Sequence, residues 1–414
     1  MLDESSVDVV IVGGGIAGGS LACALADAGL DVLVLEQQDR YRDRVRGESV
    51  SCWGVQELRA LGVEDELLGT GGTYVDTFIG YDEALAPAEA VANATRLDRI
   101  VGGVPGMLDV GHPEACAALR AAGLERGARV VSGVRDVLVE AGNTPSVVYR
   151  TADREYRRRC RLVVGADGGR SVVRRQVGIA MRIGRAEVFG GGVLINDLTG
   201  WPSNVASFGG EDGDVYFVLP RMTGQARLYL LCPRDRLGRF MGRDKNRKLV
   251  DALRLRCIPG SAMFAAASPS RICSFKPMTE SSVERVCAPG VVLIGDAAGW
   301  SDPVIGQGLS GAFRDARFVR DLLCADGKWS IETFVPYEVE RAERMRRLRI
   351  CSDVRNAMYF RHDVDAIARR KRYWSMTAAD PVLGGSRIAI LAGPFAVADQ
   401  CFHDSTVAQL LSIG

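Results

Sequence analysis

The stretch that most constrains the fold is an apolar run near the start of the chain that ends in a cluster of glycines. Residues 7–12 are VDVVIV, a run rich in β-branched side chains that is typical of a strand buried on both faces. Four glycines follow within six residues, and an apolar helical stretch then ends at Gly29. A second apolar strand, over 31–35, ends in Glu36. The sequence therefore predicts a βαβ unit that opens an α/β domain.

The spacing of these glycines, Gly13-x-Gly15-x-x-Gly18, predicts a site for the pyrophosphate of a dinucleotide. Glycines at a strand-to-helix turn allow the backbone to approach a phosphate closely, and the helix N-terminus supplies free N–H groups. Glu36 stands 18 residues after the last glycine, where a carboxylate accepts hydrogen bonds from an adenosine ribose. The pattern suits NAD and FAD equally. The predicted cofactor contacts in this unit are Gly13, Gly15, Ile16, Ala17, Gly18, Glu36 and Gln37.

Composition excludes several other classes of protein. The chain has 414 residues, 47% of them hydrophobic and 25% charged, which predicts a globular protein of two domains. A formal net charge of +1 argues against a nucleic-acid partner. Eleven cysteines without a CxxC pair and three scattered histidines predict free thiols in a reducing cytoplasm and no metal site. We expect no secretory signal and no membrane span.

Hydrophobic patterns further along predict that the domains are interleaved. Helical patterns cover 51–62 and 113–127, a strand pattern covers 129–139, and a hairpin pattern joins 146–151 to 159–164. Alternation between about 186 and 275 predicts an antiparallel sheet, and amphipathic helices dominate from 330 onward. We therefore divide the chain into three parts. These are a discontinuous first domain (1–72, 106–180 and 276–330), a sheet domain (73–105 and 181–275) and a helical C-terminal region (331–414).

Two later motifs decide between the cofactors. Residues 165–174 are GADGGRSVVR, and residues 293–313 are LIGDAAGWSDPVIGQGLSGAF. The first resembles the DG motif, and the second the GD motif, of FAD-dependent monooxygenases of the para-hydroxybenzoate hydroxylase type, the group A flavoproteins. With the N-terminal glycines, the motifs follow that family's order over most of residues 7–320. The resemblance implies an α/β fold in which a Rossmann-like FAD-binding domain is interleaved with a mainly antiparallel substrate-binding sheet and followed by C-terminal helices.

The same resemblance implies a role for individual residues. Asp167 and Gly168 would face the pyrophosphate region, Asp296 beside Gly295 would bond the ribityl chain, and Pro303 would lie beside the isoalloxazine. Backbone N–H groups of the following turn would face the pyrimidine edge and stabilise negative charge on the reduced ring. The positions that complete the implied cofactor set are Arg46, His112, Gly306, Gln307, Gly308 and Leu309.

Two residues of the DG motif receive structural roles from local chemistry alone. Ser171 stands directly before a helical stretch, where a hydroxyl side chain commonly caps the first turn. We therefore expect Ser171 to cap the helix that begins near Val172. Arg174, inside that helix, is expected to serve as an ion-pair residue.

The chemistry that the resemblance favours is oxygenation. In this family NADH or NADPH, or a separate flavin reductase, reduces FAD. Reaction with O₂ gives a flavin C4a-hydroperoxide, which oxygenates an electron-rich carbon. The protein then has to exclude water and position the substrate, so no acid–base set is required. The long apolar insert favours a hydrophobic aromatic or polycyclic substrate. Candidate pocket residues are Phe208, Tyr216, Phe217 and Tyr229.

Four alternatives remain open to different degrees. Flavin-dependent halogenases share Gly47-Glu48-Ser49, but they need a lysine in the N-terminal half, and the first lysine here is Lys245. Geranylgeranyl reductases share that triplet and also have glycine at the position of Gly299, where hydroxylases usually have histidine. This reductase hypothesis is the main alternative. FAD could also serve as a scaffold for binding or cyclisation without redox turnover, and an NAD dehydrogenase is a further possibility.

Overall fold

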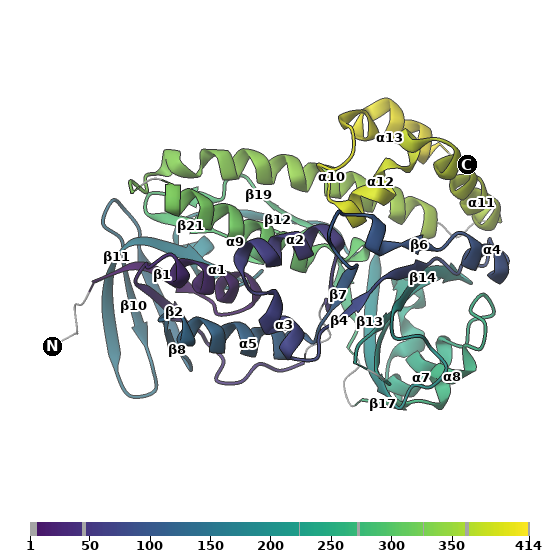
Figure 1. Ribbon diagram of the computed structural model, residues 1–414, viewed down its shortest axis with the longest axis horizontal. Coiled ribbons are helices and arrows are strands. Elements are labelled where there is room, and N and C mark those ends of the chain that lie inside the picture. Colours follow the sequence, from purple (N-terminus) through teal and green to yellow (C-terminus); the bar gives the residue numbers. More distant parts are fainter. Residues whose placement is uncertain are drawn as a thin grey trace.

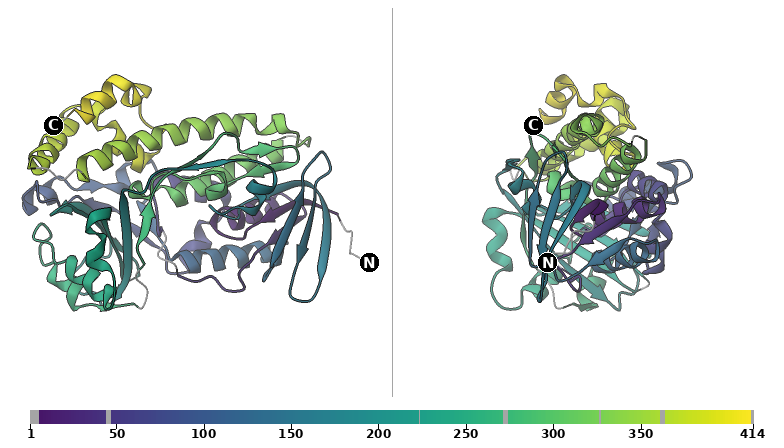
Figure 2. Two further views of the ribbon diagram at one scale, coloured as in Figure 1. Left: turned by 180° about the vertical axis from the view of Figure 1, so that it is seen from behind. Right: turned by 90° about the vertical axis from the view of Figure 1, so that its left-hand side faces the viewer.

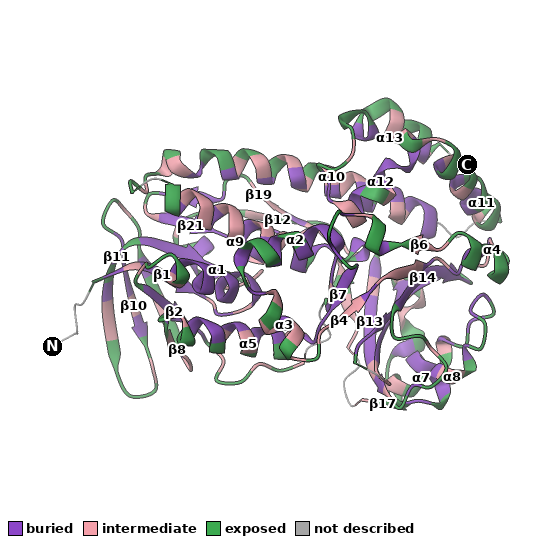
Figure 3. Ribbon diagram, in the orientation of Figure 1, coloured by how far each residue is buried: buried purple, intermediate pink, exposed green. Residues whose placement is uncertain are grey.

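The computed structural model describes residues 6–43, 47–222, 224–270, 274–325, 327–360 and 364–412. Two sheets lie at opposite ends of an elongated molecule, and the long helix α10 (Val335–Tyr359) runs above both of them (Figures 1 and 2). Buried residues are concentrated in the two sheets and in the helix faces that pack on them (Figure 3). This arrangement is the α/β fold with an inserted sheet and C-terminal helices that the sequence predicts.

The first sheet is built around β1 (Ser6–Val12), which pairs in parallel with β11 (Glu155–Gly165) on one side and β2 (Val32–Leu35) on the other. Val9, Val10 and Ile11 of β1 are fully buried, as the continuous apolar run predicts. The remaining strands of this sheet are β8 (Arg129–Val131), β9 (Asp136–Glu140), β10 (Ser146–Arg150), β20 (Cys287–Ala288) and β21 (Val291–Leu293).

The single strand predicted over 129–139 is wrong, because two strands occupy that stretch. β8 pairs in parallel with β2, whereas β9 pairs antiparallel with β10. Gly133, between them, has a φ of 71°, a left-handed conformation that ends the extended chain. The predicted hairpin over 146–164 is confirmed as β10 and β11.

Helix α1 (Ile16–Asp27) packs against both α5 (His112–Glu125) and α9 (Gly308–Ala325) beside the first sheet. Helix α2 (Cys52–Leu61) packs on α9 and ends at Gly62, whose φ is 66°. The helices predicted over 51–62 and 113–127 are therefore confirmed. Shorter helices of this half are α3 (Glu64–Gly69) and α6 (Val172–Gln176).

The second sheet contains segments from two distant parts of the chain, as the interleaved pattern predicts. Its central strands are antiparallel, and β5 joins β14 in parallel at one side. Helices α7 (Lys245–Ala252) and α8 (Ala262–Ala266) contribute to the core on one face. The strands are β5 (Thr77–Ile79), β6 (Thr95–Arg96), β13 (Val188–Asn196), β14 (Val205–Glu211), β15 (Asp214–Pro220), β16 (Ala226–Pro233), β17 (Ser268–Pro269) and β18 (Lys276–Met278).

Two short strands beside the predicted domain boundaries pair with the domain on the other side. β4 (Thr73–Val75), which the boundary at residue 73 would assign to the sheet domain, pairs with β7 (Met107–Asp109) of the first domain. β18, which the boundary at residue 276 would assign to the first domain, pairs with β13. The other short elements are β3 (Ser49–Val50), α4 (Pro87–Ala92), β12 (Met181–Ile183), β19 (Ser281–Val283) and 3-10 turns at Leu97–Arg99, Arg234–Phe240, Gly295–Ala298, Pro303–Ile305, Ile331–Phe334 and Asp399–Phe402.

The C-terminal helices close the second face of the inserted sheet. α10 packs with α11 (Ala366–Ala379), α12 (Pro381–Ala392) and α13 (Asp404–Leu411). Their apolar residues form one cluster with Phe208, Val215 and Leu231 of the sheet. Within the residues that the structure describes, no helix combines the length and the apolar character needed to cross a bilayer.

Candidate functional site

The turn between β1 and α1 has the geometry of a phosphate site. Gly13 has a φ of 104°, and a Cβ there would lie 2.4 Å from the carbonyl oxygen of Ala166. A Cβ on Gly18 would lie 1.9 Å from the carbonyl oxygen of Gly13. At Gly15, by contrast, an added Cβ would meet none of the described residues within 4 Å. No side chain in the described part of the chain caps the start of α1, so its N–H groups and the open side of Gly15 fit a pyrophosphate.

Glu36 ties the end of β2 to this turn. Its carboxylate accepts hydrogen bonds from the backbone N–H groups of Gly14 and Gln38, both at 2.7 Å, and the side chain is buried. Each carboxylate oxygen keeps a second acceptor site, so a ribose hydroxyl can still be bound. Beside it, Gln37 and Val134 border a surface cavity of about 610 Å³. The arrangement fits the adenosine end of a dinucleotide.

The DG motif meets the glycine turn through its backbone. A Cβ on Gly13 would lie 2.8 Å from the Cα of Asp167, so the two turns are in contact. The Asp167 carboxylate accepts hydrogen bonds from the N–H groups of Val172 at 2.5 Å and Val173 at 3.2 Å, at the start of α6. Asp167 thus holds α6 with one oxygen, and cofactor contact by Asp167 and Gly168 stays a prediction.

Ser171 bonds the backbone of its own helix, whereas Arg174 also bonds the backbone of a distant loop. Ser171 Oγ accepts a hydrogen bond from the N–H of Arg174 at 2.9 Å, which confirms the predicted helix cap. The predicted ion pair of Arg174 is wrong. Its guanidinium donates to the carbonyl oxygens of Gly169 and Ala297, each at 3.2 Å. Arg174 therefore joins the DG motif to the GD motif, 123 residues away in sequence.

The GD motif forms a tight loop after β21 and lies against the first helix. Gly295 has a φ of 58°, and a Cβ there would lie 3.0 Å from the Cβ of Ala17 in α1. Asp296 is half-buried next to it. Gly299 has a φ of 96° and a ψ of 161°, a conformation essentially restricted to glycine. The glycine that resembled a reductase marker therefore has a backbone reason to be there.

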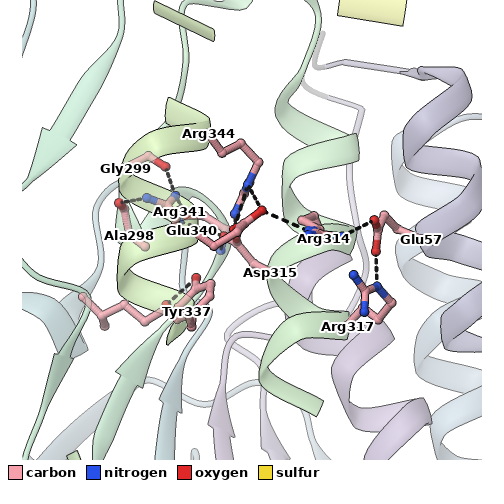
Figure 4. Close-up of polar contacts among 12 residues, drawn as sticks. Glu57, Ala298, Gly299, Arg314, Asp315, Arg317, Tyr337, Glu340, Arg341 and Arg344 are labelled. Atoms are coloured by element: carbon pink, nitrogen blue, oxygen red, sulfur yellow. Dashed lines mark hydrogen bonds and ion pairs between the residues drawn. The ribbon is translucent and has the colours of Figure 1, made fainter. Parts of the chain in front are cut away.

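A buried network of charges braces this loop from behind (Figure 4). Asp315 of α9 accepts a hydrogen bond from the N–H of Gly295 at 2.8 Å and forms ion pairs with Arg341 and Arg344 of α10. Arg341 also donates to the carbonyl oxygens of Ala298 at 2.7 Å and Gly299 at 2.6 Å. Burial tends to raise the pKa of Asp315, but the two guanidinium groups outweigh it and leave that pKa below its ordinary value.

Sequence reasoning missed this network. The segment RAERMRR carries arginines at 341 and 344, one turn apart on the same face of α10, and that spacing is a visible signal. Their acid partner Asp315, however, lies on another helix and cannot be identified without the fold.

The turn that precedes α9 is held by the side chain of Gln307, and its predicted contact with the cofactor stays a prediction. Gln307 is buried, and its Oε1 accepts a hydrogen bond from Trp53 Nε1 at 2.8 Å. Its Nε2 donates to the carbonyl oxygen of Ile305 at 2.9 Å. The neighbouring Pro303, Gly306 and Gly308 are exposed, and none of the residues that the structure describes lies within 4 Å of a Cβ built on either glycine. The backbone of this turn, which leads to Leu309, is therefore open to a flat ring.

Two further cofactor contacts are predicted, at Arg46 and His112. Arg46 lies outside the described residues. His112 is the first residue of α5, and its Nδ1 lies 3.7 Å from the Sγ of Cys116 one turn later. It is partly exposed, so a contact between His112 and the cofactor stays a prediction.

The predicted pocket aromatics separate onto two faces of the second sheet. Phe208, Phe217 and Tyr229 stand opposite one another on β14, β15 and β16, and the rings of Phe208 and Phe217 are 4.9 Å apart. Tyr216 points to the opposite face, is 1% exposed, and donates a hydrogen bond to the carbonyl oxygen of Tyr81 at 2.6 Å. Register therefore places Tyr216 in the core beneath α7 and α8, and a pocket role for these aromatic residues stays a prediction.

A second buried ion pair joins the sheet to the first domain. Arg227 of β16 is fully buried and donates to both oxygens of Glu48, at 2.8 and 3.0 Å. Glu48 is the acid of the Gly-Glu-Ser triplet, so its position here is explained by this pair. Ser51, three residues after Glu48, contacts Ser310 at the start of α9 with 2.7 Å between the hydroxyl oxygens. This segment therefore lies beside the turn that begins at Pro303.

The loops that follow β1, β2, β11 and β21 thus lie at the same edge of the first sheet, because these strands are parallel. In open α/β folds, this edge beyond the strand ends is where an extended dinucleotide binds. The fold and the site define an FAD-binding protein. The chain belongs to a known family, since the model described as "FAD binding domain" matches residues 6–348.

Known proteins agree with this class. Squalene epoxidase 2, mitochondrial, of Arabidopsis thaliana is 27% identical over 330 residues, which are 77% of this chain and 54% of that protein. The chain thus spans about half the length of that relative. Digeranylgeranylglycerophospholipid reductase 2 of Methanococcoides burtonii is 24% identical over 351 residues, which are 80% of this chain and 79% of the reductase.

Among solved structures, p-nitrophenol 4-monooxygenase PnpA of Pseudomonas putida DLL-E4 superimposes with a TM-score of 0.77 at 18% identity. The match covers 97% of this chain and 100% of PnpA. At this identity the likeness establishes the fold.

Proposed function

We propose that this protein is a monooxygenase that uses FAD, NADH or NADPH, and O₂ to hydroxylate or epoxidise a hydrophobic substrate with an aromatic or polycyclic skeleton. The observation that carries the proposal is a shared apolar cluster. Phe208 of the second sheet packs with Val304 and Ile305 of the turn that would hold the flavin ring. Phe217 and Tyr229 border the same cluster, so a substrate there would lie between aromatic side chains and the ring.

The chain's own residues would orient the reactants and exclude water. Bound FAD would supply the redox chemistry with O₂. The apolar residues around Phe208 would keep water from an apolar substrate. The backbone N–H groups at the start of α9, at Gly308 and Leu309, would face negative charge that develops on the ring.

The test is to load the purified protein with FAD and follow NADH and NADPH oxidation in air with a panel of one- to four-ring aromatic compounds. We expect some compounds to accelerate oxidation and to gain one oxygen atom by mass analysis. A parallel assay adds a separate flavin reductase as the electron source. If FAD is reduced by neither route, with or without these compounds, the proposal is wrong and a non-redox scaffold is favoured.

A reductase of the geranylgeranyl type is the second candidate. It is favoured by the match to the Methanococcoides reductase, which covers 79% of that protein, against 54% of the squalene epoxidase. Such an activity would add two hydrogen atoms to a polyprenyl double bond and proceed without O₂. Anaerobic incubation of the reduced protein with a geranylgeranyl lipid, followed by mass analysis, separates the two candidates.

A further inference from the structure

The indole of Trp53 in α2 contacts both the turn beside the expected flavin ring and the C-terminal helices. Its Nε1 donates a hydrogen bond to the Oε1 of Gln307 at 2.8 Å, and both side chains are buried. A Cβ built on Gly393, at the end of α12, would lie 3.2 Å from the Cβ and the Cγ of Trp53. Trp53 therefore joins the C-terminal region to the turn that leads into α9.

Gln307 stands at the position that caps α9, but its amide bonds other groups. Its main-chain carbonyl oxygen accepts the first hydrogen bond of the helix. At this position a side-chain oxygen commonly accepts from the second or third N–H of the helix, here that of Leu309 or Ser310. The amide oxygen of Gln307 is instead bonded by Trp53, and the amide nitrogen donates to the carbonyl oxygen of Ile305 at 2.9 Å. The amide is thus drawn away from the N-terminus of α9.

Packing between α2 and α9 keeps the indole close to Gln307. The backbone nitrogen and the hydroxyl oxygen of Ser51, directly before α2, lie 3.1 and 2.7 Å from the hydroxyl oxygen of Ser310. The Ser51 hydroxyl also makes a longer contact with Gln307 Oε1, at 3.4 Å. A Cβ on Gly54 would lie 2.4 Å from the Oγ of Ser310, so the first turns of the two helices are in direct contact. This contact fixes Trp53 beside the amide.

The N-terminus of α9 is where a released amide would act. The first N–H groups of a helix have no acceptor within the helix, and the helix dipole stabilises negative charge there. Gly308 is exposed, so these N–H groups are open to a ligand. A buried amide oxygen that loses its donor is unfavourable, and the free N–H groups of α9 are the donors that follow it along the chain. Without the indole N–H, the Gln307 amide would therefore bond those groups and occupy the anion site.

We propose that Trp53 is a positioning residue for reduced FAD. It holds the amide of Gln307 away from α9, so that the N–H groups of Gly308 and Leu309 stay free for the pyrimidine edge of the flavin ring. Because the reduced ring carries more negative charge than the oxidised ring, open N–H groups stabilise the reduced form selectively. The inference goes beyond the proposed function, since the monooxygenase and the reductase candidate both need reduced FAD.

The test is the midpoint potential of bound FAD in Trp53→Phe, measured anaerobically against a reference dye, together with the affinity of the apoprotein for oxidised FAD. Phenylalanine keeps an aromatic ring beside Gly393 and removes the donor N–H. We expect reduced FAD to bind about tenfold more weakly relative to oxidised FAD, which makes the midpoint potential about 30 mV more negative. The matched control is Trp329→Phe, which removes an indole that donates to Leu323 near the other end of α9 at 3.1 Å and should leave the potential unchanged.

Substitutions of Gln307 show whether Trp53 acts through its amide. In the Gln307→Leu background, Trp53→Phe should shift the potential no further, because no amide is left to release. Asparagine is a strong helix cap, so Gln307→Asn should bond the N–H groups of α9 itself and give a more negative potential than Gln307→Leu. This pair carries the test even if Trp53→Phe does not fold, because Trp53 is intact in both variants.

Three outcomes overturn the inference. The first is a wild-type potential in Trp53→Phe that denaturation and FAD content show to be folded and loaded. The second is an equally large shift from Trp53→Phe in the Gln307→Leu background. The third is a potential in Gln307→Asn no more negative than that in Gln307→Leu. The proposed function fails separately: these shifts without substrate-dependent oxygenation would remove the monooxygenase proposal and leave the role of Trp53.

Discussion

The arginines in the two halves of α10 differ in what they face. Arg341 and Arg344, near the start, are paired with Asp315, and Arg341 also bonds the loop at Ala298 and Gly299. Arg355, three turns later, faces a carbonyl oxygen and an aromatic ring. The protein supplies partners for both Arg341 and Arg344, so their role is to hold a loop. Among the described residues Arg355 has one hydrogen-bond acceptor, so its remaining N–H groups can be satisfied by a ligand.

This difference assigns separate tasks to one helix. Its first half fixes the GD motif against α9, and its second half faces the aromatic sheet. A single rigid helix that contacts both the expected cofactor loop and the expected substrate space keeps their separation constant. Substitutions along α10 can therefore test positioning and binding independently.

The largest effect is expected from Asp315→Asn. Loss of this carboxylate would leave Arg341 and Arg344 buried without their shared charge, which should lower the free energy of unfolding by about 3–5 kcal/mol. Urea denaturation measures the loss, and FAD content after purification should fall with it. The control is Asp321→Asn on the same helix, a half-exposed acid for which a change below about 1 kcal/mol is expected. Equal losses in both variants would contradict the bracing role.

The free energy of unfolding is expected to depend on pH because of the buried acid Asp109. Asp109 is fully buried, and in the described part of the chain no cation forms an ion pair with it. Burial, reinforced by Glu48 and only partly offset by Ser49 and Arg221, raises the pKa of Asp109 from an ordinary 3.8 to about 8. Between these values the folded protein keeps a proton that the unfolded chain loses. The free energy of unfolding should therefore fall as pH rises, by up to about 1.4 kcal/mol per pH unit.

Asp109→Asn should remove this slope, because asparagine stays neutral in both states. Urea denaturation from about pH 5 to about pH 8 measures it, with the exposed Asp251→Asn as the control that keeps the wild-type slope. Parallel profiles for wild type and Asp109→Asn would show that Asp109 is ionised in the fold across this range.

A smaller effect is expected from Gly299→Ala, at the loop that Arg341 holds. A side chain at a φ of 96° and a ψ of 161° costs about 1–3 kcal/mol, and the added Cβ would lie 3.1 Å from the carbonyl oxygen of Ser281. Denaturation and FAD content measure the change. Gly238→Ala, exposed and with nothing within 4 Å of its Cβ, is the control. If Gly299→Ala were neutral, the backbone explanation of this glycine would be lost and the reductase hypothesis would gain support.

Features that depend on short spacing could be predicted from the sequence. The glycine turn with Glu36, and the cap by Ser171, are set by a few neighbouring residues, so their patterns are specific. The strand over 129–139 failed because Gly133 ends it locally while the apolar pattern continues. The separation of Tyr216 from Phe217 follows from alternation along the strand, but alternation does not tell which face borders a pocket when both faces are covered.

Contacts between distant residues could not be predicted. The side-chain amide of Gln307 bonds Trp53, 254 residues away in sequence, and nothing in the pattern of the turn indicates that partner. Arg174 likewise bonds Ala297 and not an acid. Each partner is brought near only by the packing of α2 on α9 or by the parallel order of β11 and β21. The same holds for Asp315 and α10, so the buried network emerges only from the fold.

The smallest effect is expected from Arg355→Met, and it makes the comparison along α10 quantitative. Arg355 has no ion pair to lose, and methionine fills an apolar site with an unbranched side chain, so the free energy of unfolding should change by no more than about 1 kcal/mol. The same substitution at Arg344 removes a charge that Asp315 and Glu340 both face, and should cost about 3 kcal/mol or more. Urea denaturation of the two variants measures the contrast. A large loss for Arg355→Met would mean that this arginine holds the turn at Val304 as Arg341 holds the GD loop, and that its cation is structural.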